Sequence, residues 1–348
     1  MLHRLSPYVS GLRRRIGIRA SEPDATCLHA AEVAEHPAIA ALPGQRARVT
    51  ATVGKNAQAH LAYFDGGPLT HAACERRTYT DAFVFANGFT AHGRNFNRLG
   101  QLDHRRLLTG PVYELPEAHY CMEDRAYHYF GHWLRCFSTA LLAEDGAPIL
   151  HTPDPTWSHA ADYEAAFDLP AAKGMQFRVG RLHVYRDYAL NASKRRRLHT
   201  LARRLKARFP TVPGAPRMIY LRRGASGVSR LVAGEETLIA ALQGGGFAVV
   251  DVEGIALADL MAVLSGAEIV ISVEGSHINH AHFAMAEGGL LLVLNPADRF
   301  NAFQLARAAA FGLQPATLVM PRVEGGYGAD PAEVLDTLAL AQRPHTAV

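Results

Sequence analysis

Polar and histidine side chains follow an apolar run near residue 270, and their types could bind an anion or move a proton. The run Ile269–Val273 predicts a strand, and Leu290–Leu294 predicts the next strand after a Gly-Gly break. Open parallel sheets bind ligands beyond the carboxyl ends of their strands. The residues in that position after the first run are candidate site residues: Glu274, Gly275, Ser276 and His277.

Each of these residues also has a structural interpretation. The backbone N–H groups of Gly275 and Ser276 could hold a phosphate at the start of the following helix, or the pair could form the tight turn that the fold needs there. Glu274 could hydrogen-bond sugar hydroxyls, act as a general base, or cap the helix. The three histidines within residues 277–282 do not share one helical face, and no acidic pair lies nearby, so we expect no bound metal.

Three arginines follow the strand predicted at Met218–Leu221: Arg222, Arg223 and Arg230. Guanidinium groups suit the two phosphates of a sugar nucleotide, and they can stabilise a departing diphosphate. The alternative is a surface cluster in which the arginines pair with Glu235 and Glu236. Among the three, Arg222 and Arg230 are the preferred phosphate ligands.

A histidine in the first half of the chain is a second candidate for the general base. Helical spacing of apolar residues within Tyr127–Asp145 predicts an amphipathic helix, with His132 near its start. An imidazole is half neutral near physiological pH and can take a proton from a hydroxyl group. His132 could also be a structural residue, hydrogen-bonded at the helix start. The base therefore stays open between His132 and Glu274.

Strands and helices alternate after residue 218, with helices of about ten residues, which predicts right-handed crossovers and a parallel, Rossmann-like sheet with helices on both faces. A basic helix is predicted at Lys194–Phe209 and ends in a proline-rich stretch. We place a domain boundary there, which gives domains of residues 1–212 and 213–348. In the first domain, residues 87–106 are expected to form a long polar loop.

Composition is that of a globular protein, with 49% hydrophobic and 20% charged residues and a net charge of +4. The chain has neither an apolar run long enough for a membrane span nor a signal peptide, so we expect a cytoplasmic protein. Residues 1–20 and 193–208 are basic and lack acids, which allows peripheral contact with an anionic membrane. A nucleic-acid partner is not expected, because aromatic residues do not interleave the basic helix. The four scattered cysteines predict neither disulfides nor a zinc site.

Three signatures stand in a fixed order along the chain: FGHWL at 130–134, YLRRGASGVSRLVAGEE at 220–236 and SVEGSHINHAHFAMAEGG at 272–289. Together they resemble glycosyltransferase family 61, whose bacterial members are often linked to capsular or exopolysaccharide assembly. The resemblance covers about residues 120–300. It implies two Rossmann-like domains in a GT-B-like arrangement, with an acceptor-side first domain and a nucleotide-sugar-binding second domain.

The resemblance also implies a function. It predicts an inverting glycosyltransferase that moves a sugar to a hydroxyl of a glycan or lipid-linked glycan, without a metal or other cofactor, and a UDP-sugar is the expected donor. Glu235 matches a family acid, but Glu274 stands where the family has histidine. Gly234 and Cys136 replace a family asparagine and a family acid. These departures motivate an alternative, a catalytically silent relative that binds a nucleotide or glycan as an assembly partner.

Overall fold

The structure is a computed structural model of the chain. It describes residues 5, 22–85, 88–97, 108–122, 129–143, 146–151, 157–169, 171–173, 176–224 and 230–343. The chain forms two compact units. The first contains Met1–Glu32 and Ala72–Arg197, and the second contains Val33–His71 and Leu198–Val348. This division differs from the predicted boundary at 212/213, because the chain enters the second unit twice. The basic stretch 1–20 lies outside the described residues except for Leu5.

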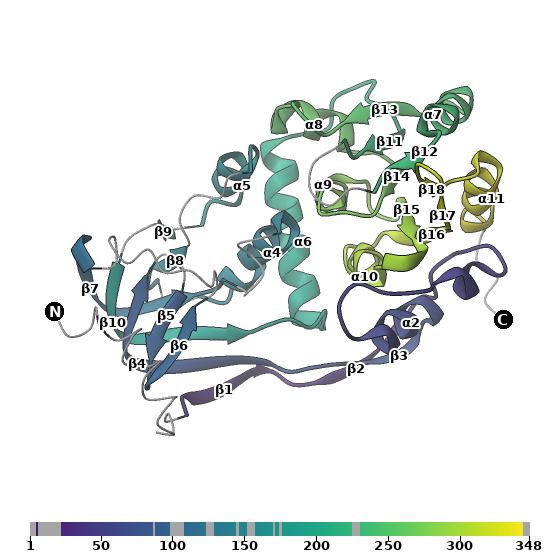
Figure 1. Ribbon diagram of the computed structural model, residues 1–348. Helices are drawn as coiled ribbons and strands as arrows, with labels where there is room; N and C mark the ends of the chain where they lie inside the picture. Colours follow the sequence, from purple (N-terminus) through teal and green to yellow (C-terminus); the bar gives the residue numbers. More distant parts are fainter. Residues whose placement is uncertain are drawn as a thin grey trace. The chain divides into compact units, whose positions relative to one another are not determined.

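The first unit is built on a mixed sheet with the order β6-β5-β4-β10-β7-β8-β9, in which β1 pairs with one end of β4 (Figure 1). Its strands are β1 (Asp24–His29), β4 (Cys74–Phe85), β5 (Gly88–Ala91), β6 (Arg94–Asn97), β7 (Val112–Tyr120), β8 (Ile149–His151), β9 (Ala171–Lys173) and β10 (Gln176–Arg186). The strands β10, β7, β8 and β9 run parallel to one another. The strand β4 is antiparallel to each of its neighbours β1, β5 and β10, and β5 is antiparallel to β6. The predicted Rossmann-like sheet is therefore present only in part of this unit.

The prediction of a long polar loop at residues 87–106 is wrong for its first half. β5 and β6 form a hairpin there, and residues 98–106 are not described. The turn contains His92 and Gly93 at φ 49° and 73°, which suits the two-residue turn of a tight hairpin. Phe89 stacks on Phe96 with ring centroids 4.4 Å apart. This cross-strand aromatic pair stabilises the hairpin, although most residues around it are polar.

Two helices follow parallel strands of the first unit, α4 (Phe130–Ala140) after β7 and α5 (Ala160–Phe167) after β8. Almost every residue of α4 is buried. Trp133 packs against Phe130, Phe137 and Trp157. The predicted helix is confirmed, and both its apolar side chains and its polar residues Arg135, Ser138 and Thr139 are buried.

The second unit is built on a sheet whose strands are all parallel, in the order β13-β11-β14-β15-β16. The strands are β11 (Met218–Arg222), β13 (Ala248–Asp251), β14 (Ile269–Val273), β15 (Leu290–Pro296) and β16 (Gln314–Met320). Numbered along the chain, the order is 2-1-3-4-5, which places the topological switch point between β11 and β14. The predicted parallel sheet is confirmed here.

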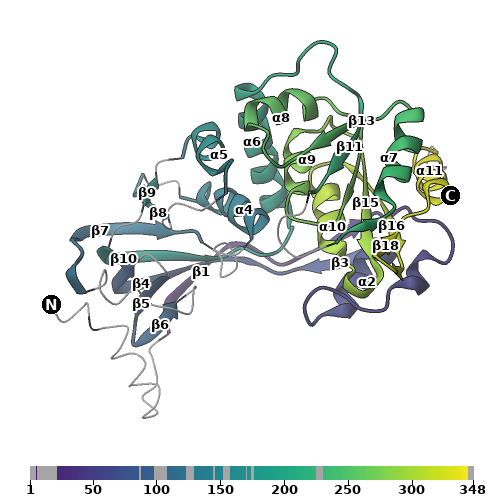
Figure 2. The same cartoon turned by 45° about the horizontal axis from the view of Figure 1, so that its top comes forward.

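Helices cover both faces of this sheet, as Figure 2 shows. They are α7 (Glu235–Gly244), α8 (Leu257–Leu264), α9 (Ile278–Ala284), α10 (Ala302–Ala310) and α11 (Pro331–Ala341). One apolar cluster joins alternate strand residues to Leu238 of α7 and to Val334 and Leu338 of α11. The residues between them, such as Val270 and Val293, are also fully buried. Except for Ser272 and Asn295, β14 and β15 are consequently apolar, as is typical of strands covered on both faces.

Residues 33–71 contribute an N-terminal segment to the second unit. They contain β2 (Glu32–His36), the 3-10 helix η2 (Gln45–Arg48), α2 (Ala57–Asp65) and β3 (Gly67–His71). Ala40 bridges to Ala316 of β16, and the Gln45 side chain accepts the backbone N–H of Val319 at 2.6 Å. This segment thereby covers the edge of the sheet at β16. Gly, Pro and polar residues interrupt its sequence, so its pairing could not be predicted.

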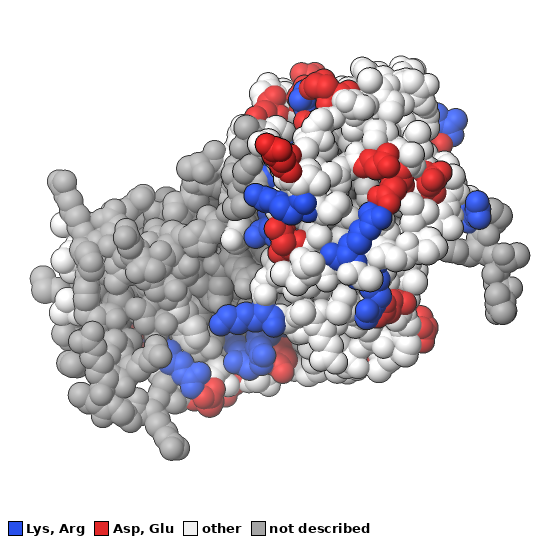
Figure 3. Space-filling model, turned by 45° about the vertical axis from the view of Figure 1, so that its right-hand side comes forward, with Lys and Arg blue, Asp and Glu red and all other residues white. Residues whose placement is uncertain are grey.

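A small three-stranded sheet completes the second unit. It contains β12 (Val232–Ala233), β17 (Arg322–Val323) and β18 (Gly326–Gly328) in the order β12-β18-β17. A 3-10 helix, η3 (Ala297–Arg299), follows β15, and the basic helix α6 (Ala192–Arg208) continues from the first unit into the second. In Figure 3, several basic side chains on the described surface lie beside acidic ones. Within the described ranges, no helix is both long and apolar enough to span a membrane.

Candidate functional site

Most of the predicted anion-binding residues meet at the carboxyl ends of β11, β14 and β15, next to the switch point. Arg223 follows β11, and residues 274–277 follow β14. Arg230 also comes from the segment after β11, and it reaches Glu274. Parallel strands bring these distant parts of the sequence to one edge of the sheet. The site therefore has the position that its sequence context predicted.

Glu274 is held on both carboxylate oxygens. The Arg230 Nε lies 3.0 Å from Oε2, and Asn301 donates its side-chain N–H to Oε1 at 2.7 Å. A second Arg230 nitrogen donates to the backbone carbonyl of Glu274 at 3.1 Å. Both side chains of this ion pair are buried, with 7% and 3% exposed. A buried pair with such added hydrogen bonds fixes the position of its guanidinium.

Gly275 is required by the close approach of two side chains. A Cβ at this position would lie 2.8 Å from Nδ1 of His277 and 3.1 Å from Nε of Arg223. Any larger residue would displace one of these groups. Gly275 also accepts, through its carbonyl, a hydrogen bond from the Gln304 side chain at 3.1 Å. Its role is thus to let Arg223 and His277 lie close to the backbone.

His277 is a neutral imidazole of fixed orientation. Its Nε2 lies 2.7 Å from the Ser272 hydroxyl, which itself lies 2.7 Å from the carbonyl of Leu221. Because the hydroxyl proton serves that carbonyl, Nε2 carries the proton donated to Ser272. Burial and the charges of Arg223 and Arg230 lower the pKa of His277 to about 3. His277 can therefore contribute a hydrogen bond at neutral pH, but no positive charge.

The positive charges of Arg230 and Arg299 repel the positive charge of Arg223. Burial, followed by the charge of Arg230, lowers the pKa of Arg223 to about 10, and Arg299 acts in the same direction. Glu274 and Glu253 oppose this effect only partly. Arg299 lies in η3, directly after β15, and was not predicted. The rule that found Glu274 applies equally to residues after Leu290–Leu294, so it would have found Arg299 and Asn301 as well.

Backbone donors face the same group of cations. In the described part of the chain, nothing accepts the N–H of Gly275, Ser276 or His277. The helix that follows, α9, has only seven residues, so its dipole adds little. Successive backbone N–H groups beside guanidinium groups supply the kind of donors that hold phosphates in proteins. Chemically, the arrangement can bind a polyphosphate.

Arg222 and Glu235 do not join this group. Alternation along β11 directs Arg222 to the face opposite Arg223. There Arg222 donates to Glu235 at 3.2 Å and to Glu236 at 2.8 Å, and Tyr220 donates to Glu235 at 2.7 Å. This is the surface ion-pair cluster that the sequence allowed as the alternative. Arg222 and Glu235 tie the start of α7 to β11.

His132 lies in the first unit, in the first turn of α4. Its Nδ1 accepts a hydrogen bond from Arg135 at 3.0 Å, which leaves the proton on Nε2. Neither nitrogen then offers a free lone pair to a substrate hydroxyl. Cys136, which replaces a family acid, donates its S–H to the His132 carbonyl and is fully buried. His132 therefore cannot accept a proton from a substrate hydroxyl while it holds these hydrogen bonds.

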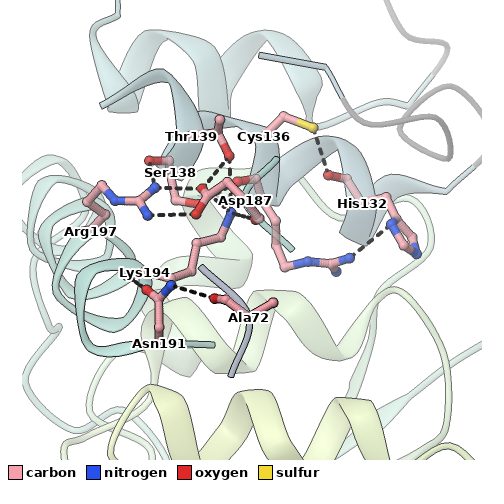
Figure 4. A network of polar contacts seen from close by, with 10 residues as sticks. Ala72, His132, Cys136, Ser138, Thr139, Asp187, Asn191, Lys194 and Arg197 are labelled. Carbon is pink, nitrogen blue, oxygen red and sulfur yellow. Dashed lines mark hydrogen bonds and ion pairs between the residues drawn. The ribbon is translucent and has the colours of Figure 1, made fainter. Parts of the chain in front are cut away.

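A buried ion cluster lies beside α4, as Figure 4 shows. Asp187 accepts hydrogen bonds from Lys194 at 2.8 Å and from Arg197 at 2.8 and 2.9 Å, and Thr139 adds one at 2.8 Å. Burial would raise the pKa of Asp187, but the two cations outweigh it and hold that pKa well below its usual range. Two cations of the basic helix are thus structural, which weakens the case for a nucleic-acid surface there.

Across the ranges that the structure describes, no three His, Cys, Asp or Glu side chains are grouped to hold a metal ion. His280 and His282 are buried in α9, where His282 stacks on Phe311. Their place in the apolar core accounts for the histidines in this helix.

Part of the chain matches a known protein family. No curated protein matches the chain. Residues 130–291 match the family model described as Glycosyltransferase 61. The matched range begins at α4 and ends in β15, so it contains His132, the arginines after β11 and residues 274–277. Over this range the chain is similar to glycosyltransferase family 61.

Proposed function

We propose that the protein transfers a sugar from a nucleotide-diphosphate donor to a hydroxyl of a glycan or lipid-linked glycan, with inversion, in surface polysaccharide synthesis. The observation that carries the proposal is the buried Arg230–Glu274 pair at the switch point, with Arg223 beside Gly275 and with Arg299 close enough to lower the pKa of Arg223. Mutual repulsion among these cations disfavours the ligand-free site. A diphosphate would relieve that repulsion and accept the N–H groups of residues 275–277.

The same group would assist bond cleavage. Negative charge grows on the diphosphate as its bond to the anomeric carbon breaks, and guanidinium groups already in place stabilise it without reorganisation. Glu274 would act mainly as a positioning group, because both its oxygens are engaged by Arg230 and Asn301. We include in the proposal a UDP-sugar donor, a metal-independent reaction and an acceptor-side role for the first unit. The GT-B arrangement rests on the family match alone.

The base remains the open part of the mechanism. His132 accepts a hydrogen bond from Arg135 at its Nδ1, and the Glu274 carboxylate is held by an ion pair with Arg230 and a hydrogen bond from Asn301. Either residue would have to release a contact before it could accept a proton from the acceptor hydroxyl. This observation favours a second candidate function, a relative that binds a sugar nucleotide without turning it over. Transfer or hydrolysis of a UDP-sugar by the purified protein would exclude the second function.

The test is thermal unfolding with UDP, GDP, CMP, ADP and their sugars, in the wild type, Arg299→Gln and Arg46→Gln. Arg299 has no ion pair among the described residues, so its loss should perturb the fold little. Arg46 is an exposed arginine of the same unit, paired with Asp65. We expect one nucleotide to raise the melting temperature of the wild type and Arg46→Gln, and to do so much less in Arg299→Gln. No shift with any nucleotide would overturn the proposal.

A further inference from the structure

The two loops that carry Arg230 and Arg299 are joined by a third segment, the hairpin of β17 and β18. Its central residue is Tyr327, which is 6% exposed. Tyr327 donates its backbone N–H to the carbonyl of Leu231 at 2.9 Å. Its hydroxyl donates to Oδ1 of Asp298 at 2.9 Å. One residue thus contacts the direct neighbour of Arg230 and the direct neighbour of Arg299.

The hairpin is built to hold this position. Gly326 has φ 155°, and a Cβ there would lie 2.3 Å from the Leu231 carbonyl oxygen. Only glycine lets the hairpin approach that carbonyl so closely. On the other side, the guanidinium of Arg322 lies over the Tyr327 ring, 4.9 Å from its centroid. Val232 and Tyr327 are paired in the parallel register between β12 and β18.

We propose that Tyr327 is a positioning residue, which sets the spacing of Arg230 and Arg299 and thereby the affinity of the site for a diphosphate. The inference rests on the proposed function, because it concerns the same site. Arg230 directly precedes Leu231, so the hydrogen bond from Tyr327 to Leu231 fixes the chain directly after Arg230. Asp298 is exposed and precedes Arg299, so the hydroxyl bond fixes η3 from the solvent side.

The experiment measures binding of UDP, UMP and uridine by calorimetry in the wild type, Tyr327→Phe, Asp298→Ala and the double variant. Loss of one hydrogen bond should weaken UDP binding about three- to tenfold in Tyr327→Phe. Uridine binding should change less than about twofold, since the base does not touch these loops in the proposal. In the Asp298→Ala background, the Tyr327→Phe effect should nearly vanish, because both changes remove the same bond.

Thr337→Val is the matched control, since it removes a buried hydroxyl that bonds the Glu333 carbonyl within α11 of the same unit. It should leave UDP affinity unchanged. If the wild type binds UDP and Tyr327→Phe binds it equally well, the inference fails and the proposed function stands. Equal losses for UDP and uridine, or losses as large in Thr337→Val, would show a merely structural role and also overturn the inference. If the wild type binds none of the three ligands, the proposed function fails with it.

Discussion

Replacing Arg223 by methionine should stabilise the ligand-free protein and remove its response to nucleotides. The structure lowers the pKa of Arg223 from 12.5 to about 10, through burial and the charges of Arg230 and Arg299. A shift of this size disfavours the charged form by about 3 kcal/mol. Solvent screening and the loss of favourable contacts reduce the part that methionine recovers. We therefore expect the free energy of unfolding to rise by about 1 kcal/mol.

Urea unfolding measures this change, provided that the slope with denaturant stays the same. Nucleotide at about 100 times its dissociation constant should add about 2.7 kcal/mol to the wild type, and clearly less to Arg223→Met. Arg222→Met is the matched comparison, because Arg222 is the adjacent arginine but pairs with Glu235 and Glu236 on the other face. It should keep the nucleotide response. A destabilised Arg223→Met that keeps the full response, or a lost response in Arg222→Met, would refute the reasoning.

Three further predictions concern the same architecture. The pKa of His277 is lower in the folded state than in the unfolded chain, so its contribution to stability is complete above about pH 6.5 and is lost as pH falls toward 3. Between pH 7 and 4, the free energy of unfolding of the wild type should therefore fall by on the order of 1–2 kcal/mol more than that of His277→Gln. Equal losses of the two proteins in urea unfolding would contradict this. Gly275→Ala should weaken UDP binding roughly tenfold by displacing Arg223 and His277, and unchanged calorimetric affinity would show that the site tolerates a Cβ. Asp187→Asn should lower the free energy of unfolding by about 3–5 kcal/mol, because it leaves the buried cations Lys194 and Arg197 without their carboxylate. The control Arg178→Gln breaks an exposed pair with Asp81 and should change stability little. A small effect of Asp187→Asn would mean that water reaches the cluster.

The second unit could be predicted well because its signals are local. Apolar runs such as Ile269–Val273 and Leu290–Leu294 mark strands buried on both faces, and the residues after the first run mark the site. What escaped prediction depends on contacts distant in sequence. The pairing of Gln45 with Val319, and the Nδ1 of His60 that accepts the Ala302 N–H, place residues 33–71 in the second unit. Neither contact produces a periodic pattern of apolar residues in the sequence.

The arginines show how far residue types alone can lead. Arg222 and Arg223 are adjacent and equivalent in a motif, yet alternation along β11 sends them to opposite faces. The sequence analysis preferred Arg222, while the structure places Arg223 beside Gly275 and His277. The charged neighbours of Arg222 and Arg223 then determine the role of each. Glu235 and Glu236 engage Arg222, whereas burial and the charges of Arg230 and Arg299 act on Arg223 and are partly opposed by Glu274 and Glu253. Such choices depend on side-chain neighbours, which become visible only in three dimensions.

The most direct test of the central claim is the position of the two phosphates in a crystal structure with bound UDP. The account predicts that they lie at the carboxyl ends of β11, β14 and β15, within hydrogen-bond distance of Arg223, Arg230 or Arg299 and of the N–H groups of Gly275 and Ser276. Phosphates bound beside Arg222 and α7, or UDP bound only in the first unit, would contradict it.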